Sequence, residues 1–162
     1  METKMQVRKI LEKDNASLAI IIRTSLKEFN ANKPGTVYFD ETTDHLSDIF
    51  KLKNAAYFVL ETEGEIAGGS GFYPTKGLPP DTCELVKLYV SKKFRGKGFG
   101  QILLDKCMKE AKQSGFQKMY LETMPELTSA IPMYQKNGFH FIKSSMGNSG
   151  HTGCDVWMLK NL

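Results

Sequence analysis

A glycine-rich basic turn that joins a strand to a helix constrains this sequence more than any other segment. Residues 82–90 have the largely apolar composition of a buried strand, and residues 98–114 carry apolar side chains at helical spacing. The turn between them contains four basic residues and three alternating glycines: Lys92, Lys93, Arg95, Lys97, Gly96, Gly98 and Gly100. The chain must therefore place a helix N-terminus directly after a strand, inside a positively charged loop.

The chemistry of a helix N-terminus makes this turn a predicted phosphate site. The first four N–H groups of a helix lack intrahelical partners, and the helix dipole places partial positive charge beside them. Glycine lets phosphate oxygens approach these groups because no Cβ stands in the way. We expect pyrophosphate as the natural ligand, with charge-assisted contacts from Arg95 and Lys97. A tight turn with a purely structural role is the alternative that the residues leave open.

Two other phosphate-binding motifs do not match this turn. A dinucleotide-binding fingerprint requires a glycine at the position of Gln101. A Walker A loop requires serine or threonine after its Gly-Lys pair, and here Gly98 follows Gly96-Lys97. The turn therefore predicts an anion site of a different class.

The rest of the sequence predicts one α/β domain. With 162 residues, 41% of them hydrophobic, the chain has the size of one domain and can bury a substantial core. No Pro/Gly/Ser-rich linker divides it, so we expect a single domain over residues 1–162. Strands are expected at 6–10, 55–60, 65–73, 82–90, 117–123, 139–143 and 155–160, and helices at 14–29, 43–52, 98–114 and 129–137. This order favours a partly antiparallel sheet with helices on both faces.

Local signals predict how some of these elements begin and join. Asp14 is the expected N-cap of the first helix. Thr62-Glu63-Gly64 predicts a hairpin between two strands. Gly68, Gly69 and Gly71 interrupt the second of these strands, so we expect a bulge or a close backbone approach there.

Charge and cysteine content exclude several classes of function. The net charge of +4, from 22 basic and 18 acidic residues, fits an anionic ligand but is too small to argue for nucleic acid. Three cysteines without a CxxC spacing predict neither a disulfide framework nor a zinc site, and no metal is expected. The longest aliphatic run, residues 18–22, is too short to span a membrane. We therefore expect a soluble cytoplasmic protein.

Two blocks of the sequence resemble the GNAT superfamily of N-acetyltransferases. Arg95-Gly96-Lys97-Gly98-Phe99-Gly100 matches the family signature Arg/Gln-x-x-Gly-x-Gly/Ala. Residues 84–90 are similar to the family's fourth strand, and residues 130–139 to its Ala-x-x-Leu/Met-Tyr-x-x-x-Gly-Phe helix. The resemblance covers residues 82–143. It implies the GNAT fold, an α/β domain whose mixed, mostly antiparallel sheet is splayed between strands 4 and 5.

The resemblance also implies an activity, the transfer of an acetyl group from acetyl-CoA to a primary amine by direct attack. The backbone of Leu88, Tyr89 and Val90 should pair with the pantetheine arm of coenzyme A as an added strand would. The N–H groups of the turn should hold the pyrophosphate, which assigns cofactor binding to Arg95, Gly96, Lys97, Gly98, Phe99 and Gly100.

Glu84 and Tyr134 match the positions of catalytic residues in relatives. Glu84 is the expected general base, acting directly or through water. The alternative for Glu84 is a strand glutamate that only positions substrate. Tyr134 is the expected general acid towards the departing thiolate, and the alternative is an aromatic ring that only packs against the cofactor.

The sequence departs from the family pattern at one position and leaves the acceptor open. Many relatives carry an asparagine where Leu127 stands, so no contact of that asparagine is carried over. In the family the most variable segments build the acceptor pocket, and here these are residues 30–44, 73–82 and 144–153. Small-molecule amines and protein amines both remain open as acceptors. The acidic residues available to attract a cationic amine are Asp40, Glu41, Asp44 and Asp81.

Other readings of the sequence also remain. A non-catalytic acyl-CoA-binding sensor or interaction domain is the alternative function. A catalytic pair of Cys154 and His151 is a weaker alternative site, because nothing in the sequence orients a third member. By family analogy the protein forms a homodimer, and neither nucleic acid nor membrane is an expected partner.

Overall fold

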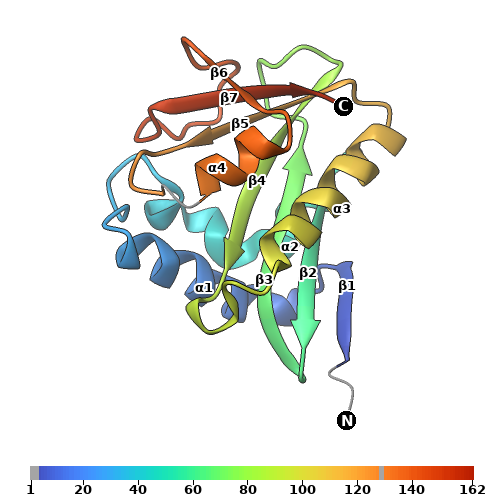
Figure 1. Cartoon of the computed structure of the whole chain (residues 1–162), viewed down its shortest axis with the longest axis vertical. Helices are drawn as coiled ribbons and strands as arrows, with labels where there is room; N and C mark the ends of the chain where they lie inside the picture. The colour runs from blue at the N-terminus through green and yellow to red at the C-terminus, as the bar shows by residue number, and fades with distance from the viewer. Residues whose placement is uncertain (1–3, 128–129) are drawn as a thin grey trace.

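A seven-stranded sheet forms the frame of the protein (Figure 1). The computed structural model describes residues 4–127 and 130–162. The strands lie in the order β1-β2-β3-β4-β5-β7-β6. Their bounds are β1 Met5–Lys9, β2 Ala56–Thr62, β3 Glu65–Tyr73, β4 Thr82–Val90, β5 Lys118–Thr123, β6 His140–Ile142 and β7 Val156–Asn161.

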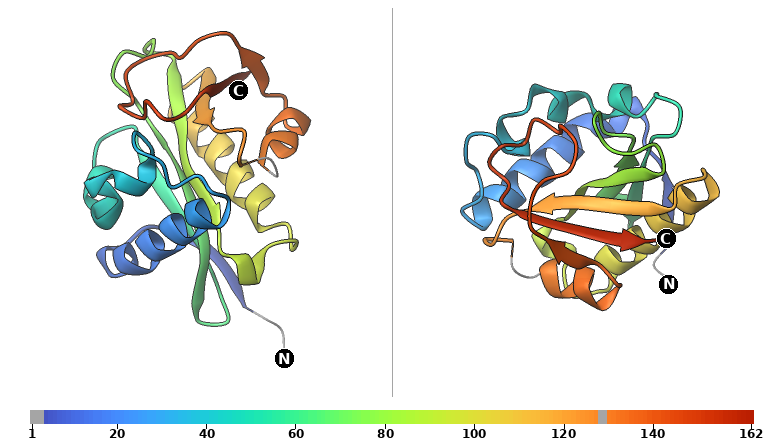
Figure 2. Two further views of the ribbon diagram at one scale, coloured as in Figure 1. Left: turned by 90° about the vertical axis from the view of Figure 1, so that its left-hand side faces the viewer. Right: turned by 90° about the horizontal axis from the view of Figure 1, so that it is seen from above.

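Every neighbouring pair of strands is antiparallel except β4 and β5, which are parallel. The helices are α1 Asn15–Glu28, α2 Leu46–Ile49, α3 Phe99–Gln113 and α4 Ala130–Lys136. Figure 2 shows α1 and α2 on one face of the sheet and α3 and α4 on the other. The predicted α/β class, mixed sheet and two-sided helix cover are confirmed. None of the helices in the described ranges is long and apolar enough to cross a membrane.

The sheet opens between β4 and β5. These strands pair only over Thr82–Glu84 on β4 and Lys118–Tyr120 on β5. In Figure 1, β5 and β7 run across the ends of β2, β3 and β4 instead of alongside them. From Leu85 onwards, one edge of β4 is therefore left without a neighbouring strand in the described part of the chain. The predicted splay is confirmed.

A bulge in β4 lies just beyond this divergence. Gly69 pairs with Tyr89 and Gly71 with Val86, so two residues of β4 face the single residue Ser70 of β3. One of the two, Lys87, has φ +53°, a left-handed conformation that is uncommon outside glycine. The hydroxyl of Tyr57 crosses β3 and donates a hydrogen bond of 2.8 Å to the Lys87 carbonyl oxygen.

The glycines of β3 make this crossing possible. A Cβ at Gly69 would lie 2.5 Å from a ring carbon of Tyr57, and one at Gly68 would lie 2.3 Å from the Tyr89 carbonyl oxygen. A Cβ at Gly71 would lie 2.5 Å from the Ala56 carbonyl oxygen. The sequence predicted a bulge or a close backbone approach at these glycines, and both are present.

Two local predictions need correction or refinement. The predicted helix over 43–52 is wrong in extent, because the 3-10 turn Glu41–His45 is followed by the short helix α2. Asp40 accepts a hydrogen bond of 2.9 Å from the Thr42 amide, and Thr43 donates one of 2.9 Å to the Val37 carbonyl oxygen. These side-chain bonds hold the segment in tight turns and compete with a regular α-helix.

Asp14 also behaves differently from the prediction. It does stand immediately before α1, but its side chain does not cap that helix. The carboxylate instead accepts bonds of 2.7 and 2.9 Å from Arg8 and one of 2.8 Å from the Leu11 amide. The predicted start of another helix at Thr128 or Ser129 falls on residues outside the described ranges.

The contact of Gly69 with Tyr57 generates a stability prediction. Gly69→Ala should lower the free energy of unfolding by about 2 kcal/mol, because the added Cβ displaces a fully buried ring. Urea denaturation followed by circular dichroism measures the change. Gly100→Ala is the matched control, since its Cβ would meet only the Met133 side chain, at 3.5 Å or more. Equal stabilities of the two variants would contradict the proposed packing.

Candidate active site

A cleft opens where β4 and β5 diverge. It has a cavity volume of about 330 Å³ and lies between the free edge of β4 and the N-terminal end of α3. We call it the main cleft, and the side chains and backbone that line it come from α1, β4, the basic turn, β5 and α4. Its β4 wall runs from Leu85 through Val90, without Val86, and its α4 wall is formed by Ala130, Met133 and Tyr134.

The β4 wall presents unpaired backbone to the cleft. Leu88, Tyr89 and Val90, which the sequence assigned to cofactor binding, all line it. No residue of β5 pairs with them in the described part of the chain. A linear ligand with amide groups can hydrogen-bond to such an edge as an added strand does.

The basic turn ends in the helix N-terminus that the sequence predicted. Gly98 is the N-cap of α3, with φ +81°, and Gly96 has φ +77°. A Cβ at either position would meet nothing within 4 Å, so both glycines border open space. Gly96, Gly98, Phe99 and Gly100 line the main cleft, which exposes the first-turn N–H groups of α3 to a ligand there.

The two basic side chains of the predicted anion site, Arg95 and Lys97, contact other side chains of the protein. The Arg95 guanidinium donates to both carboxylate oxygens of Glu28, at 2.8 and 2.6 Å, and lies 4.9 Å over the Phe29 ring. Lys97 lies 5.5 Å over the Phe94 ring and does not line the cleft. Arg95 thus links α1 to the turn, and the turn offers an anion mainly its backbone N–H groups.

Tyr134 lies on the opposite wall of the same cleft. It is buried, with 7% of its surface exposed, and its ring packs edge-on against Phe139 at 5.7 Å between centroids. Burial raises the pKa of the Tyr134 phenol well above its usual value. The phenol therefore stays protonated at every physiological pH and can serve as a hydrogen-bond donor to an anion in the cleft.

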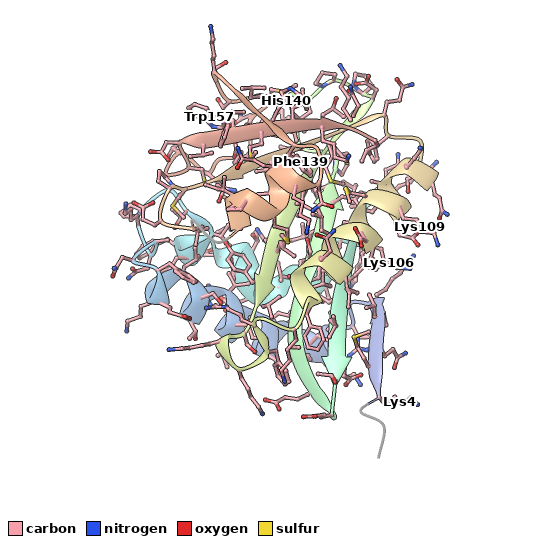
Figure 3. All side chains as sticks on the ribbon, viewed as in Figure 1. Lys4, Lys106, Lys109, Phe139, His140 and Trp157 are labelled. Atoms are coloured by element: carbon pink, nitrogen blue, oxygen red, sulfur yellow. The ribbon has the colours of Figure 1, made fainter. Side chains whose placement is uncertain are left out.

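Figure 3 labels two residues of the C-terminal strands, His140 and Trp157. His140 and Trp157 lie on β6 and β7, at the C-terminal edge of the sheet. Neither lines the main cleft or the two cavities described next. They therefore take no part in the candidate site.

Two further cavities continue the main cleft. The inner cavity, of about 50 Å³, shares Leu85, Lys87, Tyr89 and Glu122 with the main cleft. The outer cavity, of about 730 Å³, shares Glu84, Lys87 and His151 with the inner one. The three cavities therefore adjoin one another through shared walls, from the N-terminus of α3 to a group of polar side chains beyond β4, and we call them together the passage.

Glu84 stands at the centre of this passage. Only 4% of its surface is exposed, and Thr75 donates a hydrogen bond of 2.6 Å to its carboxylate. Burial, with a smaller contribution from the negative charge of Glu122, raises the pKa of Glu84 to about 7. A carboxyl group with a pKa near neutrality is suited to accept a proton at physiological pH.

Sequence reasoning missed two partners of Glu84. Ligand atoms of Glu84, Glu122 and His151 all lie within 4.8 Å of one another. Glu122 accepts hydrogen bonds from the hydroxyls of Tyr120, at 2.7 Å, and Ser149. The only advance signal for Glu122 is a charged residue within a strand that is otherwise largely apolar.

His151 enters the cluster from the loop after β6. Its Nε2 lies 3.2 Å from the Asp40 carboxylate. His151 and Cys154 formed the alternative catalytic pair predicted from the sequence. However, burial raises the pKa of the Cys154 thiol to about 12. That thiol stays neutral, so the alternative site lacks an activated nucleophile.

Of the four acidic residues that the sequence offered for a cationic acceptor, only Asp40 lines the passage. Asp44 instead pairs with Arg23. Asp81 accepts a hydrogen bond of 2.8 Å from the Thr82 hydroxyl. Leu127, at the position where many relatives carry asparagine, lines both the main cleft and the inner cavity.

The chain is similar in sequence to proteins named as N-acetyltransferases. The family model described as "Acetyltransferase (GNAT) family" matches residues 22–139. The Escherichia coli protein named "Uncharacterized N-acetyltransferase YjgM" is 38% identical over 158 residues, which cover 96% of this chain and 94% of that protein. Human N-acetyltransferase 8 is 31% identical over 133 residues, which cover 75% of this chain and 58% of that protein.

Solved structures share the fold. A GNAT-family acetyltransferase from Staphylococcus aureus Mu50 superposes with a TM-score of 0.80 at 20% identity, covering 98% of this chain and 99% of the other. The PaiA N-acetyltransferase from Thermoplasma acidophilum, solved in complex with coenzyme A, superposes with a TM-score of 0.73 at 19% identity, covering 98% and 99%. YncA from Salmonella typhimurium, solved with acetyl-CoA, gives 0.75 at 21% identity, covering 98% and 94%.

The raised pKa of Glu84 predicts how stability depends on pH. The unfolded chain has the ordinary value near 4.5, and the folded protein has about 7. Below pH 4.5 Glu84 is neutral in both the folded and the unfolded state, so it does not change the free energy of unfolding with pH. Above pH 7 Glu84 is ionised in both states, and burial of its charge lowers the free energy of unfolding. Wild type should therefore lose about 3 kcal/mol of unfolding free energy relative to Glu84→Gln as the pH rises through this window.

Urea denaturation of both proteins at a series of pH values measures this difference directly. Ionisable groups that do not interact with Glu84 change the stability of both proteins equally. They therefore cancel in the difference between wild type and Glu84→Gln at each pH. Stability curves that run parallel across the window would show that Glu84 titrates at its ordinary value.

Proposed function

The chain belongs to the GNAT family of acetyltransferases, and on that premise we propose how its cleft moves an acetyl group from acetyl-CoA to a primary amine. The observation that carries the assignment is the main cleft itself. There, an unpaired strand edge and an open helix N-terminus face one cavity. Two relatives in fold were solved with coenzyme A and with acetyl-CoA.

The cofactor contacts follow from the two backbone features. We assign the pantetheine arm to the free edge formed by Leu88, Tyr89 and Val90, whose backbone can complete hydrogen bonds with its amides. We assign the pyrophosphate to the N–H groups of residues 95–100, with Gly96 and Gly98 leaving room for its oxygens. Positioning the thioester at the far end of this edge brings it towards Tyr134 and the inner cavity.

The chemistry requires a proton acceptor and a group that stabilises the departing thiolate. An acceptor that arrives as an ammonium group first loses one proton to water, and the neutral amine nitrogen then attacks the thioester carbonyl carbon. The carbon–sulfur bond breaks, and the nitrogen loses a second proton as the amide forms. We assign that proton to Glu84, directly or through water, because its pKa of about 7 leaves it largely ionised at slightly alkaline pH. Tyr134 donates a hydrogen bond to the developing thiolate, since its phenol remains protonated.

The alternative of a non-catalytic acyl-CoA-binding module is less well supported. Such a module needs the main cleft but has no use for a buried carboxyl group in the cavity beside it. The relatives are also named as N-acetyltransferases. Thiol release measured across a library of amines tests the activity, and an absence of turnover on every amine would favour the module.

The domain organisation, cellular location and partners of the enzyme are also proposals. The described residues share one continuous sheet, which supports a single N-acetyltransferase domain over 1–162. All three cysteines are unpaired, which is consistent with a cytoplasmic location. A homodimer, and the absence of nucleic-acid partners, stay predictions.

The anion site generates a binding prediction at Gly98. Gly98→Asp should weaken acetyl-CoA binding at least about a hundredfold, because a carboxylate would stand against the pyrophosphate. Gly98→Asn is the matched control, since asparagine has the same shape, no charge and tolerates positive φ. Calorimetric titration measures both affinities, and circular dichroism checks the fold. If the aspartate variant bound acetyl-CoA as tightly as the asparagine variant, the proposed pyrophosphate site would be contradicted.

The two proposed catalytic residues generate a kinetic prediction. Glu84→Gln and Tyr134→Phe should each lower kcat by about 10²–10³-fold and leave the affinity for acetyl-CoA nearly unchanged. In wild type, kcat should rise with pH through about 7, as Glu84 loses its proton. Steady-state kinetics and calorimetry separate the two quantities. A large loss of affinity with unchanged kcat would indicate a binding role instead.

A further inference from the structure

Lys87 is a cation placed inside the reaction passage without a partner. Lys87 lines the main cleft, the inner cavity and the outer cavity. It forms no hydrogen bond or ion pair with any residue of the ranges 4–127 and 130–162. Burial lowers the pKa of the Lys87 amine, although the nearby carboxylates of Asp40 and Glu84 act in the opposite direction. The amine is therefore partly desolvated and close to negative charge, but it is paired with no carboxylate of the described residues.

The fold fixes the position of this lysine. Lys87 is the bulge residue of β4 with φ +53°, and the Tyr57 hydroxyl holds its carbonyl oxygen at 2.8 Å. The carbonyl oxygen of the preceding residue, Val86, accepts a longer bond of 3.4 Å from Ser70. A backbone held on this edge gives the side chain a defined origin beside the passage. Lys87 therefore differs from a surface lysine that samples many directions in water.

The opposite charge lies next to Lys87 in the same passage. Glu84, Glu122 and His151 bring ligand atoms within 4.8 Å of one another, and Asp40 holds His151 at 3.2 Å. Glu84 and Glu122 both accept hydrogen bonds from hydroxyl groups, which leaves their remaining lone pairs for a further donor. An ammonium group, with its N–H donors, suits such a cluster.

From this juxtaposition we infer that the acceptor is a zwitterion, an amine that carries a carboxylate beside its amino group, as a free α-amino acid does. The ammonium group is received by the cluster of Glu84, Glu122 and His151, and the carboxylate pairs with Lys87. This inference rests on the proposed acetyl-transfer function and names its substrate class. The acceptor's carboxylate then gives Lys87 a partner of opposite sign, and its ammonium group is shared by the two glutamates, as partly buried charges require.

The same charges disfavour the other acceptor classes. A polyamine would bring additional cations towards Lys87, and like charges repel strongly in a partly desolvated site. The side-chain amine of a protein lysine has no carboxylate beside it and would leave Lys87 unpaired. A divalent cation on the two glutamates and His151 would also face the Lys87 charge. The structure therefore favours an acceptor that contains both signs of charge.

The test compares matched acceptors that differ only in the carboxylate. An α-amino acid and its carboxamide share one side chain and one amine, so their ratio of kcat/KM isolates the carboxylate. Wild type should favour the acid about tenfold or more, the effect of one charge-assisted hydrogen bond. Lys87→Met should lower this ratio to near one, because only the acid loses a charge partner, whereas any effect of the lost cation on Glu84 is common to both acceptors. Lys87→Arg, which keeps the charge, should retain part of the preference.

Comparing ratios between variants removes the intrinsic difference between the two amines. A wild type that prefers the amide or a polyamine, or a Lys87→Met variant with an unchanged ratio, would overturn the inference and leave acetyl transfer intact. Loss of activity on adding EDTA would overturn it in favour of a metal site. Turnover on no amine at all would instead count against the proposed function.

A second measurement needs no variant. The N-acetylated amino acid should inhibit wild type more strongly than its N-acetylated amide, because only the acid retains the carboxylate for Lys87. Equal inhibition by the two products would contradict the pairing. Acetyl-CoA titration of Lys87→Met checks that the cofactor cleft remains intact in the variant.

Discussion

The hydrogen bond from the Tyr57 hydroxyl to the Lys87 carbonyl oxygen, 2.8 Å long, connects most features of this structure. Tyr57 lies on β2 and reaches β4 across β3, which is possible because Gly69 presents no side chain in its path. The bond holds a bulge whose left-handed residue would otherwise be unfavourable. Because the bulge lies on the stretch of β4 that β5 has already left, the strand keeps its contact with β3 while its other edge stays open.

The open edge and the helix after it form a site that is built largely from backbone. Strand-edge amides and carbonyls and the first N–H groups of α3 need only the right path of the chain, with glycines where a ligand approaches. Arg95 supports this path from behind by joining Glu28 of α1 to the Val90 carbonyl oxygen. The acceptor side of the passage is different, because it depends on the side chains of Glu84, Glu122, His151 and Lys87.

This difference explains which parts could be predicted from the sequence. The strand, basic turn and α3 are contiguous, so composition and spacing predicted both their structure and an anion site. The glycines of β3 likewise predicted a local irregularity. The cluster around Glu84 joins β4, β5 and the loop before β7, and no local pattern indicates that these distant segments meet. The 43–52 segment was mispredicted because side-chain hydrogen bonds of Asp40 and Thr43 outweigh its helical periodicity.

The charges of the passage connect recognition of the acceptor with the proposed role of Glu84 as a base. A buried carboxyl group with a pKa near neutrality serves as a base only if no nearby cation holds it fully ionised at lower pH. Lys87 is near enough to lower the pKa of Glu84, but burial has the larger effect. An acceptor that neutralises Lys87 with its own carboxylate would remove this opposing influence as it binds. The ammonium group of the same acceptor lowers the pKa of Glu84 again until it gives up its proton, so a zwitterion adds no net charge beside the base, whereas a simple cationic amine would add one.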